Sequence, residues 1–333
     1  MDLELYEQHG TLLAMDGDGD GDGVPLFYGR AGVGTAGIPL VLNDGIGCDG
    51  FAWRHLMPML ADRHPVVHWN YRSHGRSGSG PSLARLTLPA LAEDMVRVMD
   101  GLHLERAVLL GHSMGTQVAL EAYRPRARPR GGWVLLCGSS GRITNTFHGG
   151  DLLHRVLPTV STRVARNRSA ARGVFGRIPA SVAYRLGTLS GEIDKRTFRL
   201  ADFERYWDHI ATMDPDRFLT LLDAAGSHSA EDLLPNITAP TLVVAADGDT
   251  FHAAGAGEAN GRPHPGAEHF LVRVASHGGP RWSTRSRSSC ASRSSARARG
   301  AHGSAPRPHD RATRRRALRY AHGEHRAGWV PSA

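Results

Sequence analysis

The segment Ala107–Glu121, which reads AVLLGHSMGTQVALE, decides the fold. Its first four residues form an apolar run with the length of a buried strand, and residues 116–123 have the pattern of a helix. Between them, GHSMG places Ser113 at the centre of a G-x-S-x-G motif in a strand–turn–helix context. The glycines permit a tight turn, and the helix N-terminus that follows favours a nearby oxyanion. The sequence therefore predicts a nucleophilic Ser113, the alternative being an ordinary strand–helix connection.

Two glycine-rich loops upstream also follow predicted strands. A buried strand predicted at 38–43 leads into DGIGCDG at residues 44–50. A second strand predicted at 64–70 leads into the polar turn YRSHGRSG at residues 71–78. Loops of this kind can turn backbone N–H groups toward the space above a sheet. Helices are predicted nearby, at 51–61 and 86–102.

These landmarks, in this order, resemble those of the α/β-hydrolase fold family. A fourth landmark, APTLVVAADGD at residues 239–249, adds to the resemblance, which extends roughly from Val24 to His277. The resemblance implies an α/β fold with a mostly parallel central sheet flanked by helices. It also implies that Ser113, the serine of the G-x-S-x-G motif, is the nucleophile of the reaction.

The resemblance further implies how the chain is divided. Residues 24–141 and 236–277 are expected to form the core, and residues 142–235 are expected to form a helical cap over the active site. Before the core, residues 1–23 end in Asp-Gly repeats, and we predict a flexible segment. Within the expected cap, helices are predicted at 152–166, 180–189, 203–213 and 215–225.

The remaining catalytic residues follow from their places in the family pattern. The triad acid is expected at the second aspartate after the strand predicted at 240–246, which is Asp249, with Asp247 as the fallback. The catalytic histidine is expected after the last predicted strand, at His277, ahead of His269 and His252. This assignment gives the chain order Ser, Asp, His that is typical of the fold.

One departure from the family pattern concerns the oxyanion loop. The loop commonly reads His-Gly, whereas Asp44 occupies the histidine position here. Because the donors are backbone N–H groups, the oxyanion hole is still expected at Ile46 and Met114. The Asp44 carboxylate is expected to lie near the site and to disfavour anionic substrates.

These residues predict hydrolysis of a carboxylic ester or a related acyl bond. His277 would take the proton of Ser113, Asp249 would orient the imidazole, and water would hydrolyse the acyl-enzyme. The chemistry needs a small-molecule acyl substrate and no metal or organic cofactor. Perhydrolase, haloperoxidase, acyl-transfer and C–C hydrolase reactions use the same triad and stay open. A hypothesis of another class is an inactive or binding-only product with a disrupted C-terminal third.

The positive charge of the chain lies at one end. Residues 278–333 hold 13 arginines and two acids, a balance of +11, so the total of +8 leaves −3 for residues 1–277. The composition of this tail predicts disorder. Three interpretations stay open: a basic arm, a solvated extension without a role, and an out-of-register translation of the family's last helix, which resequencing would reveal. Without interleaved aromatic residues, we expect no specific nucleic-acid partner.

Other features exclude several classes of protein. The D-x-D-x-D-G pattern from Asp16 lacks the Glu that a calcium loop needs. Cys48, Cys137 and Cys290 form neither a disulfide framework nor a metal-ligand cluster. No apolar stretch approaches the ~20 residues of a membrane span, and the acidic start lacks the plan of a secretion signal. We expect a cytoplasmic protein without a membrane partner; the sequence does not indicate an oligomeric state.

Overall fold

The description of the chain comes from a computed structural model. It describes residues 3–15, 21–124, 131–142, 159, 162–164, 166–167, 173, 177–189, 193, 195, 198–246 and 267–272. Two predicted catalytic residues, Asp249 and His277, lie outside the described residues. The same is true of the tail, of Asp247 and His252, and of most of the helix predicted at 152–166.

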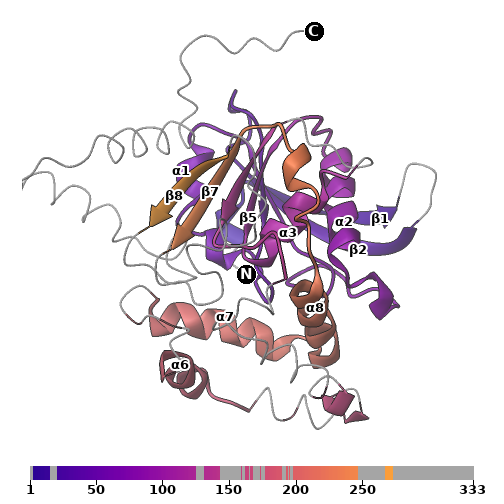
Figure 1. Cartoon of the computed structure of the whole chain (residues 1–333), viewed down its shortest axis with the longest axis vertical. Helices are drawn as coiled ribbons and strands as arrows, with labels where there is room; N and C mark the ends of the chain where they lie inside the picture. The colour runs from indigo at the N-terminus through magenta and orange to yellow at the C-terminus, as the bar shows by residue number, and fades with distance from the viewer. Residues whose placement is uncertain are drawn as a thin grey trace, which may run out of the picture.

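A central sheet of eight strands runs through the described part of the chain (Figure 1). The order across the sheet is β1-β2-β4-β3-β5-β6-β7-β8. The first two pairings are antiparallel, and every pairing from β4 to β8 is parallel, which confirms the predicted fold class. The strands are β1 (Gln8–Met15), β2 (Gly21–Ala31), β3 (Leu40–Asn43), β4 (Val66–Trp69), β5 (Val108–His112), β6 (Gly132–Leu136), β7 (Thr241–Ala246) and β8 (Glu268–Val272).

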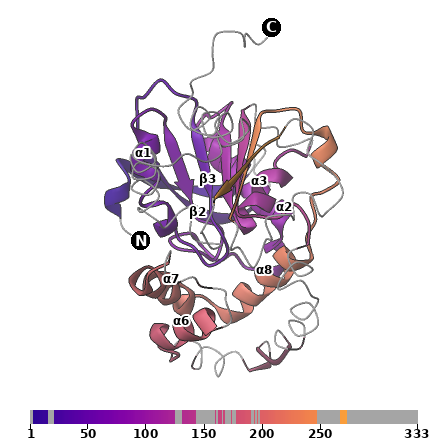
Figure 2. The same ribbon diagram turned by 60° about the vertical axis from the view of Figure 1, so that its left-hand side comes forward.

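Helices cover both faces of the sheet and one end of it. Figure 2 shows α1 on one face, α2 and α3 on the other, and α6 and α7 beyond the end of the sheet. Short 3₁₀ turns lie at Leu3–Leu5, Phe51–Trp53, Leu83–Arg85 and Leu234–Asn236. The helices are α1 (Met57–Ala61), α2 (Leu88–Gly101), α3 (Met114–Glu121), α6 (Ala180–Leu189), α7 (Leu200–Thr212) and α8 (Pro215–Ser227).

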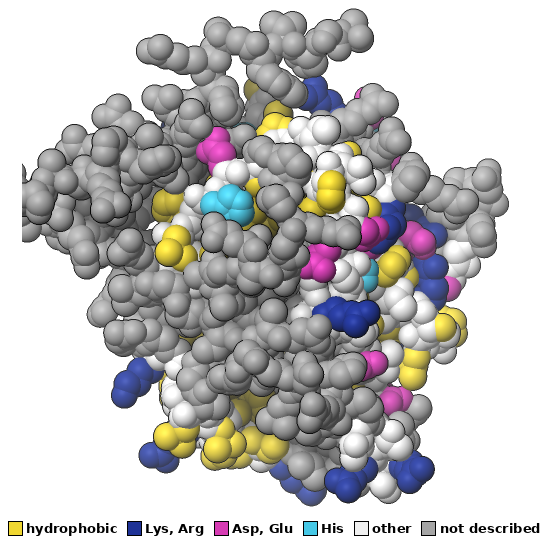
Figure 3. Space-filling model, viewed as in Figure 1, with side chains coloured by type: hydrophobic (Ala, Val, Ile, Leu, Met, Phe, Trp, Pro, Cys, Tyr) yellow, Lys and Arg dark blue, Asp and Glu magenta, His cyan; other side chains and the backbone are white. Residues whose placement is uncertain are grey.

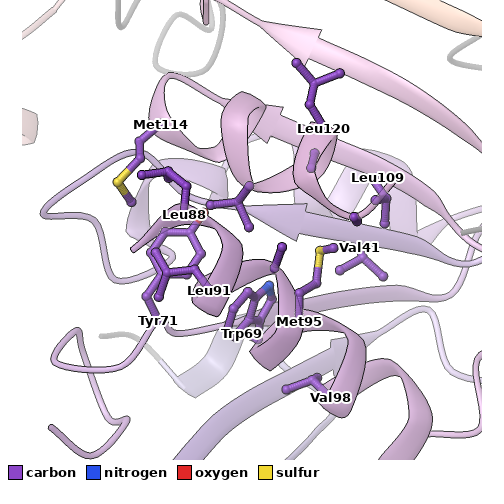
Figure 4. Close-up of a cluster of buried hydrophobic side chains, with 14 of the residues drawn as sticks. Val41, Trp69, Tyr71, Leu88, Leu91, Met95, Val98, Leu109, Met114 and Leu120 are labelled. Carbon is purple, nitrogen blue, oxygen red and sulfur yellow. The ribbon is translucent and has the colours of Figure 1, made fainter. Parts of the chain in front are cut away.

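The core lies on both faces of the sheet, and β3 shows how one strand serves both. Val41 belongs to the cluster under α2 and α3, whereas Leu40 and Leu42 belong to the cluster under α1. Successive side chains of a strand point to opposite faces, so a strand covered on both faces is apolar throughout. This explains why the central strands are recognisable as continuous apolar runs. The cluster under α2 and α3 includes Trp69, Leu91 and Met114 (Figure 4).

The N-terminal segment corrects one prediction. We expected residues 1–23 to be flexible, but the structure places β1 there, antiparallel to β2, with Thr11 opposite Phe27. Tyr6, just before the strand, is buried, and so is Ala14 within it. Most of the β1 side chains stay at least partly exposed. Because only a short part of the strand faces the core, its hydrophobic pattern is too weak to predict a strand.

A buried ion pair fixes the polar turn at residues 71–78 to its surroundings. The Arg72 guanidinium donates two hydrogen bonds to Asp94 in α2, both of 2.7 Å. Neither side chain of this pair is exposed to solvent. A third bond of 2.5 Å joins Arg72 to Asp22 in β2. The turn is therefore tied to a helix and to a strand through one arginine.

Exposed apolar side chains lie on α6. Val182 is 44% exposed, Leu186 61% and Leu189 84%. Apolar side chains gather over this helix in the space-filling view (Figure 3). None of the helices in the described residues is both long and apolar enough to cross a membrane.

Candidate active site

Ser113 lies at a sharp bend between a strand and a helix. It follows His112, the last residue of β5, and precedes Met114, the first residue of α3. Its backbone has φ 54° and ψ −122°, a conformation that L-residues adopt only at a cost. The Ser113 N–H donates to the Leu136 carbonyl at 3.1 Å, and its own carbonyl accepts from Thr116 at 3.0 Å. The strained bend is therefore held by hydrogen bonds on both sides.

Both glycines of the motif are required by close backbone contacts. A Cβ on Gly111 would lie 2.3 Å from the carbonyl oxygen of Gly115. A Cβ on Gly115 would lie 2.2 Å from the carbonyl oxygen of Asn43, at the end of β3. The bend thus packs against β3 at a distance that only a residue without a side chain permits.

The loop after β3 lies directly beside Ser113. A Cβ on Gly45 would be 3.3 Å from the Ser113 Cβ, so the two segments are in contact. Ile46, the next residue in this loop, is partly exposed. On the other side, Met114 is 1% exposed and begins α3, where the first N–H groups of a helix have no intrahelical acceptor. The structure therefore brings Ser113, Ile46 and Met114 together; their catalytic roles stay predictions.

The Asp44 carboxylate, in the loop that contacts Ser113, is buried and bonded to interior side chains. The Asp44 side chain is 1% exposed, and it pairs with His68, whose side chain is fully buried. One carboxylate oxygen accepts from Trp53 Nε1 at 2.7 Å, and the other lies 2.8 Å from His68 Nε2. Tyr6 completes this network through a bond of 2.7 Å to His68 Nδ1. Asp44 is thus a partner of buried side chains.

His74, in the polar turn, supports the loop after β3. Its Nε2 accepts from the Gly47 N–H at 3.1 Å, and its Nδ1 lies 3.1 Å from the Arg72 carbonyl. Because a backbone N–H only donates and a carbonyl only accepts, the ring is neutral with its proton on Nδ1. Burial lowers the pKa of His74 to about 4, which agrees with this neutral state.

We expect the free energy of unfolding to fall as the pH decreases from about 6.5 to about 4, because of His74. In this window the unfolded chain binds a proton at this ring and the folded chain does not, so stability rises with pH. His74 contributes on the order of 1–3 kcal/mol to this change in the free energy of unfolding. Urea unfolding at several pH values measures it.

The matched comparison is between His74→Gln, which keeps a donor and an acceptor, and His103→Gln at an exposed position. The His74 variant should lose most of the pH slope between 6.5 and 4, whatever its stability at pH 7. Equal slopes in the two variants would contradict the assignment.

The second-choice histidine, His269, does not meet Ser113. It lies within β8, opposite Val243 of β7, and its side chain is exposed. β8 is three strands from β5 in the sheet, which corresponds to roughly 14 Å. The alternative assignment of His269 as the catalytic histidine is therefore wrong.

Two residues of α7 bond to backbone carbonyls of the loop after β3, and neither was predicted as a site residue. The Tyr206 hydroxyl donates to the Ile46 carbonyl at 3.3 Å. His209 Nδ1 lies 2.8 Å from the Gly47 carbonyl. Both lie in the helix predicted at 203–213, three positions apart and hence on one face. That spacing was visible in the sequence, but nothing in it indicates which surface the face contacts.

The family follows from a comparison with known proteins. A family model described as the alpha/beta hydrolase fold matches residues 38–278. The chain belongs to the α/β-hydrolase fold family. This result confirms the resemblance seen in the sequence, and the matched region contains the strand–bend–helix unit around Ser113.

Curated relatives match shorter parts of the chain. A putative carbamate hydrolase, RutD, of Caulobacter vibrioides (strain NA1000 / CB15N) is 39% identical over 97 residues, 29% of this chain and 36% of the relative. The uncharacterized hydrolase YugF of Bacillus subtilis (strain 168) is 30% identical over 100 residues, 30% of this chain and 36% of the relative. The α/β-hydrolase chain thus spans about a third of the length of these relatives.

Solved structures match most of the chain. An esterase from Thermogutta terrifontis has a TM-score of 0.65 at 23% identity, covering 87% of this chain and 98% of the esterase. A bromoperoxidase from Bacillus anthracis has a TM-score of 0.62 at 18% identity, covering 81% of this chain and 93% of the bromoperoxidase. At these identities the comparison establishes the α/β-hydrolase fold.

Proposed function

We propose that this α/β-hydrolase-fold protein is a serine hydrolase that cleaves a carboxylic ester or a related acyl bond. The observation that carries the proposal is the strained backbone of Ser113 between β5 and α3. A serine held in such a bend at the N-terminus of a helix is the arrangement that nucleophilic hydrolases of this fold use. Relatives named as a carbamate hydrolase and an esterase support an acyl substrate.

In the proposed reaction, the Ser113 hydroxyl attacks the acyl carbonyl while His277 takes its proton. Asp249 orients the imidazole and stabilises its charged form. The bond to the leaving group breaks, the leaving group takes the proton from His277, and an acyl-enzyme remains. Water activated by the same histidine then releases the acid and restores Ser113.

The register of the sheet supports the choice of the acid. His112 pairs with Leu136, and Leu136 pairs with Val244. β7 therefore ends two residues beyond the level at which β5 ends, at the same edge of the sheet. This register supports the proposal that the acid is one of the two aspartates that follow β7 in the sequence, of which the family pattern favours Asp249.

The oxyanion hole is proposed at the N–H groups of Ile46 and Met114. Ile46 lies in the loop that contacts Ser113, and Met114 is the first residue of α3. The positive end of the helix favours the negative charge that develops on the carbonyl oxygen. Each such donor contributes roughly 10²–10³-fold to the rate in enzymes of this kind.

Helices α6 to α8 are proposed to form the cap, with α7 next to the active site. Arg205 lies 3.3 Å from Asp49 in the loop after β3, so α7 is also tied to this loop by charges. Asp202 pairs with Arg54, just beyond the 3₁₀ turn that follows the loop. The substrate is proposed to be a small acyl compound held between α7 and Ser113. Perhydrolysis and C–C hydrolysis would use the same residues, and a panel of substrates separates these reactions.

A fluorophosphonate probe tests the proposal without knowledge of the substrate. We expect one adduct per chain by intact mass, located on Ser113 by peptide mapping, because only an activated serine reacts readily. Ser140→Ala, which changes a serine at the same edge of the sheet, should be labelled like the wild type. A folded protein that takes up no label would contradict the proposal and would favour an inactive or binding-only product.

A further inference from the structure

The loop beside Ser113 contains a tight turn whose conformation has two alternatives. The Cys48 N–H donates to the Gly45 carbonyl at 3.2 Å, which closes a turn over residues 45–48. Gly47, at the third position, has φ +70°, as in a type II turn. Type I and type II turns differ chiefly in the orientation of the middle peptide, which here joins Ile46 to Gly47.

Side chains from two separate segments hold this middle peptide at both ends. Its N–H, from Gly47, donates to His74 Nε2 at 3.1 Å. Its carbonyl, from Ile46, accepts from the Tyr206 hydroxyl at 3.3 Å. If the peptide flipped, its carbonyl would face the His74 ring nitrogen, which carries no proton, whereas the Tyr206 hydroxyl could still accept from the N–H. His74 therefore selects one of the two turn conformations, and Tyr206 adds a bond that holds the carbonyl in it.

His209 holds the following carbonyl and connects the turn to a second loop. The Gly75 N–H donates to His209 Nε2 at 2.9 Å, so the ring carries its proton on Nδ1. That Nδ1 donates to the Gly47 carbonyl at 2.8 Å. In addition, a Cβ on Gly47 would lie 2.8 Å from Ile210 Cγ1, which shows how closely α7 packs on the turn.

We propose that Tyr206 and His209 are positioning residues, through which α7 sets the orientation of the turn that presents the Ile46 N–H to the reacting carbonyl. The inference rests on the proposed function. Neither side chain needs to touch the substrate, because Tyr206 acts on the peptide next to the one that carries the proposed donor, and His209 acts on the carbonyl that follows. A displacement of such a donor by a fraction of an ångström weakens its bond in the transition state more than in the ground state.

Tyr206→Phe and His209→Leu are expected to lower kcat/KM for p-nitrophenyl butyrate by roughly 3–10-fold and 10–100-fold, with KM changed less than about twofold. The matched control is Tyr184→Phe, which removes a hydroxyl that donates to the Phe198 carbonyl at 2.7 Å. His209→Gln keeps a donor and an acceptor and should retain most of the activity.

A trifluoromethyl ketone separates positioning from general loosening of the fold. Addition of Ser113 Oγ to its carbonyl places a negative oxygen in the proposed oxyanion hole, with the serine proton moving to the catalytic base. The inhibition constant should rise in Tyr206→Phe and His209→Leu by the factor by which kcat/KM falls. A fall in kcat/KM without that rise, or variants that match Tyr184→Phe, would overturn the inference. A wild type that resists both the ketone and the fluorophosphonate would instead refute the proposed function.

Discussion

Ser113→Ala is expected to lower kcat/KM for p-nitrophenyl acetate and butyrate by about 10⁴-fold or more. The variant lacks the oxygen that forms the acyl-enzyme, so only the oxyanion donors and binding would assist water. Alanine has the same Cβ and meets the same contacts at φ 54°. The fold should therefore persist, and a thermal melt close to that of the wild type would show that the loss is chemical. Unchanged activity would mean that another group performs the reaction.

The same assay identifies the residues that act with Ser113. His277→Gln and Asp249→Asn are expected to reduce kcat/KM strongly, since the members of a triad act as a unit. Asp247→Asn should have a small effect. Ser140→Ala is the control, because its hydroxyl is not part of the proposed mechanism. If Asp247→Asn were the more damaging change, the acid assignment would move to that residue.

Asp94→Ala is expected to lower the free energy of unfolding by about 3–5 kcal/mol. The change leaves the Arg72 guanidinium, which is fully buried, without the partner that accepts two of its hydrogen bonds. Asp22 still accepts the third, and its side chain is 18% exposed. A buried guanidinium that keeps only one, partly exposed partner costs more than the loss of a surface pair.

Chemical unfolding measures this effect, with Asp100→Ala as a control in the same helix at an exposed position. The control should change stability by less than about 0.5 kcal/mol. The double variant Arg72→Met with Asp94→Leu should be more stable than Asp94→Ala, since both charges are removed together. If Asp94→Ala were as stable as Asp100→Ala, the result would contradict the stabilising role of the Arg72–Asp94 pair.

The central strands and the bend were predictable because their signals are local. Each parallel strand is covered on both faces, so its residues form an apolar run, and the bend needs glycines at fixed positions. β1 was missed because it is an edge strand with little buried surface. The partners of the Asp44 carboxylate, Trp53 and His68, could not be predicted because the family pattern does not indicate them.

The contacts of α7 were beyond prediction for a different reason. Tyr206 meets Ile46, and His209 meets Gly47, across separations of about 160 positions in the chain. A tyrosine and a histidine on one helical face fit a solvated surface equally well. Only the three-dimensional path of the chain decides which loop they touch.

The buried partners near the N-terminus set a limit on how this protein can be shortened. The family match begins at residue 38, but Tyr6 is hydrogen-bonded to the buried ring of His68, and Asp22 pairs with Arg72. A gene trimmed to the family boundary would delete β1 and β2 and uncover the edge of β4. It would leave an imidazole and a guanidinium in the interior without these partners. We therefore expect a chain that begins at the family boundary to be less stable than the full chain, because β1 and β2 belong to the folded unit.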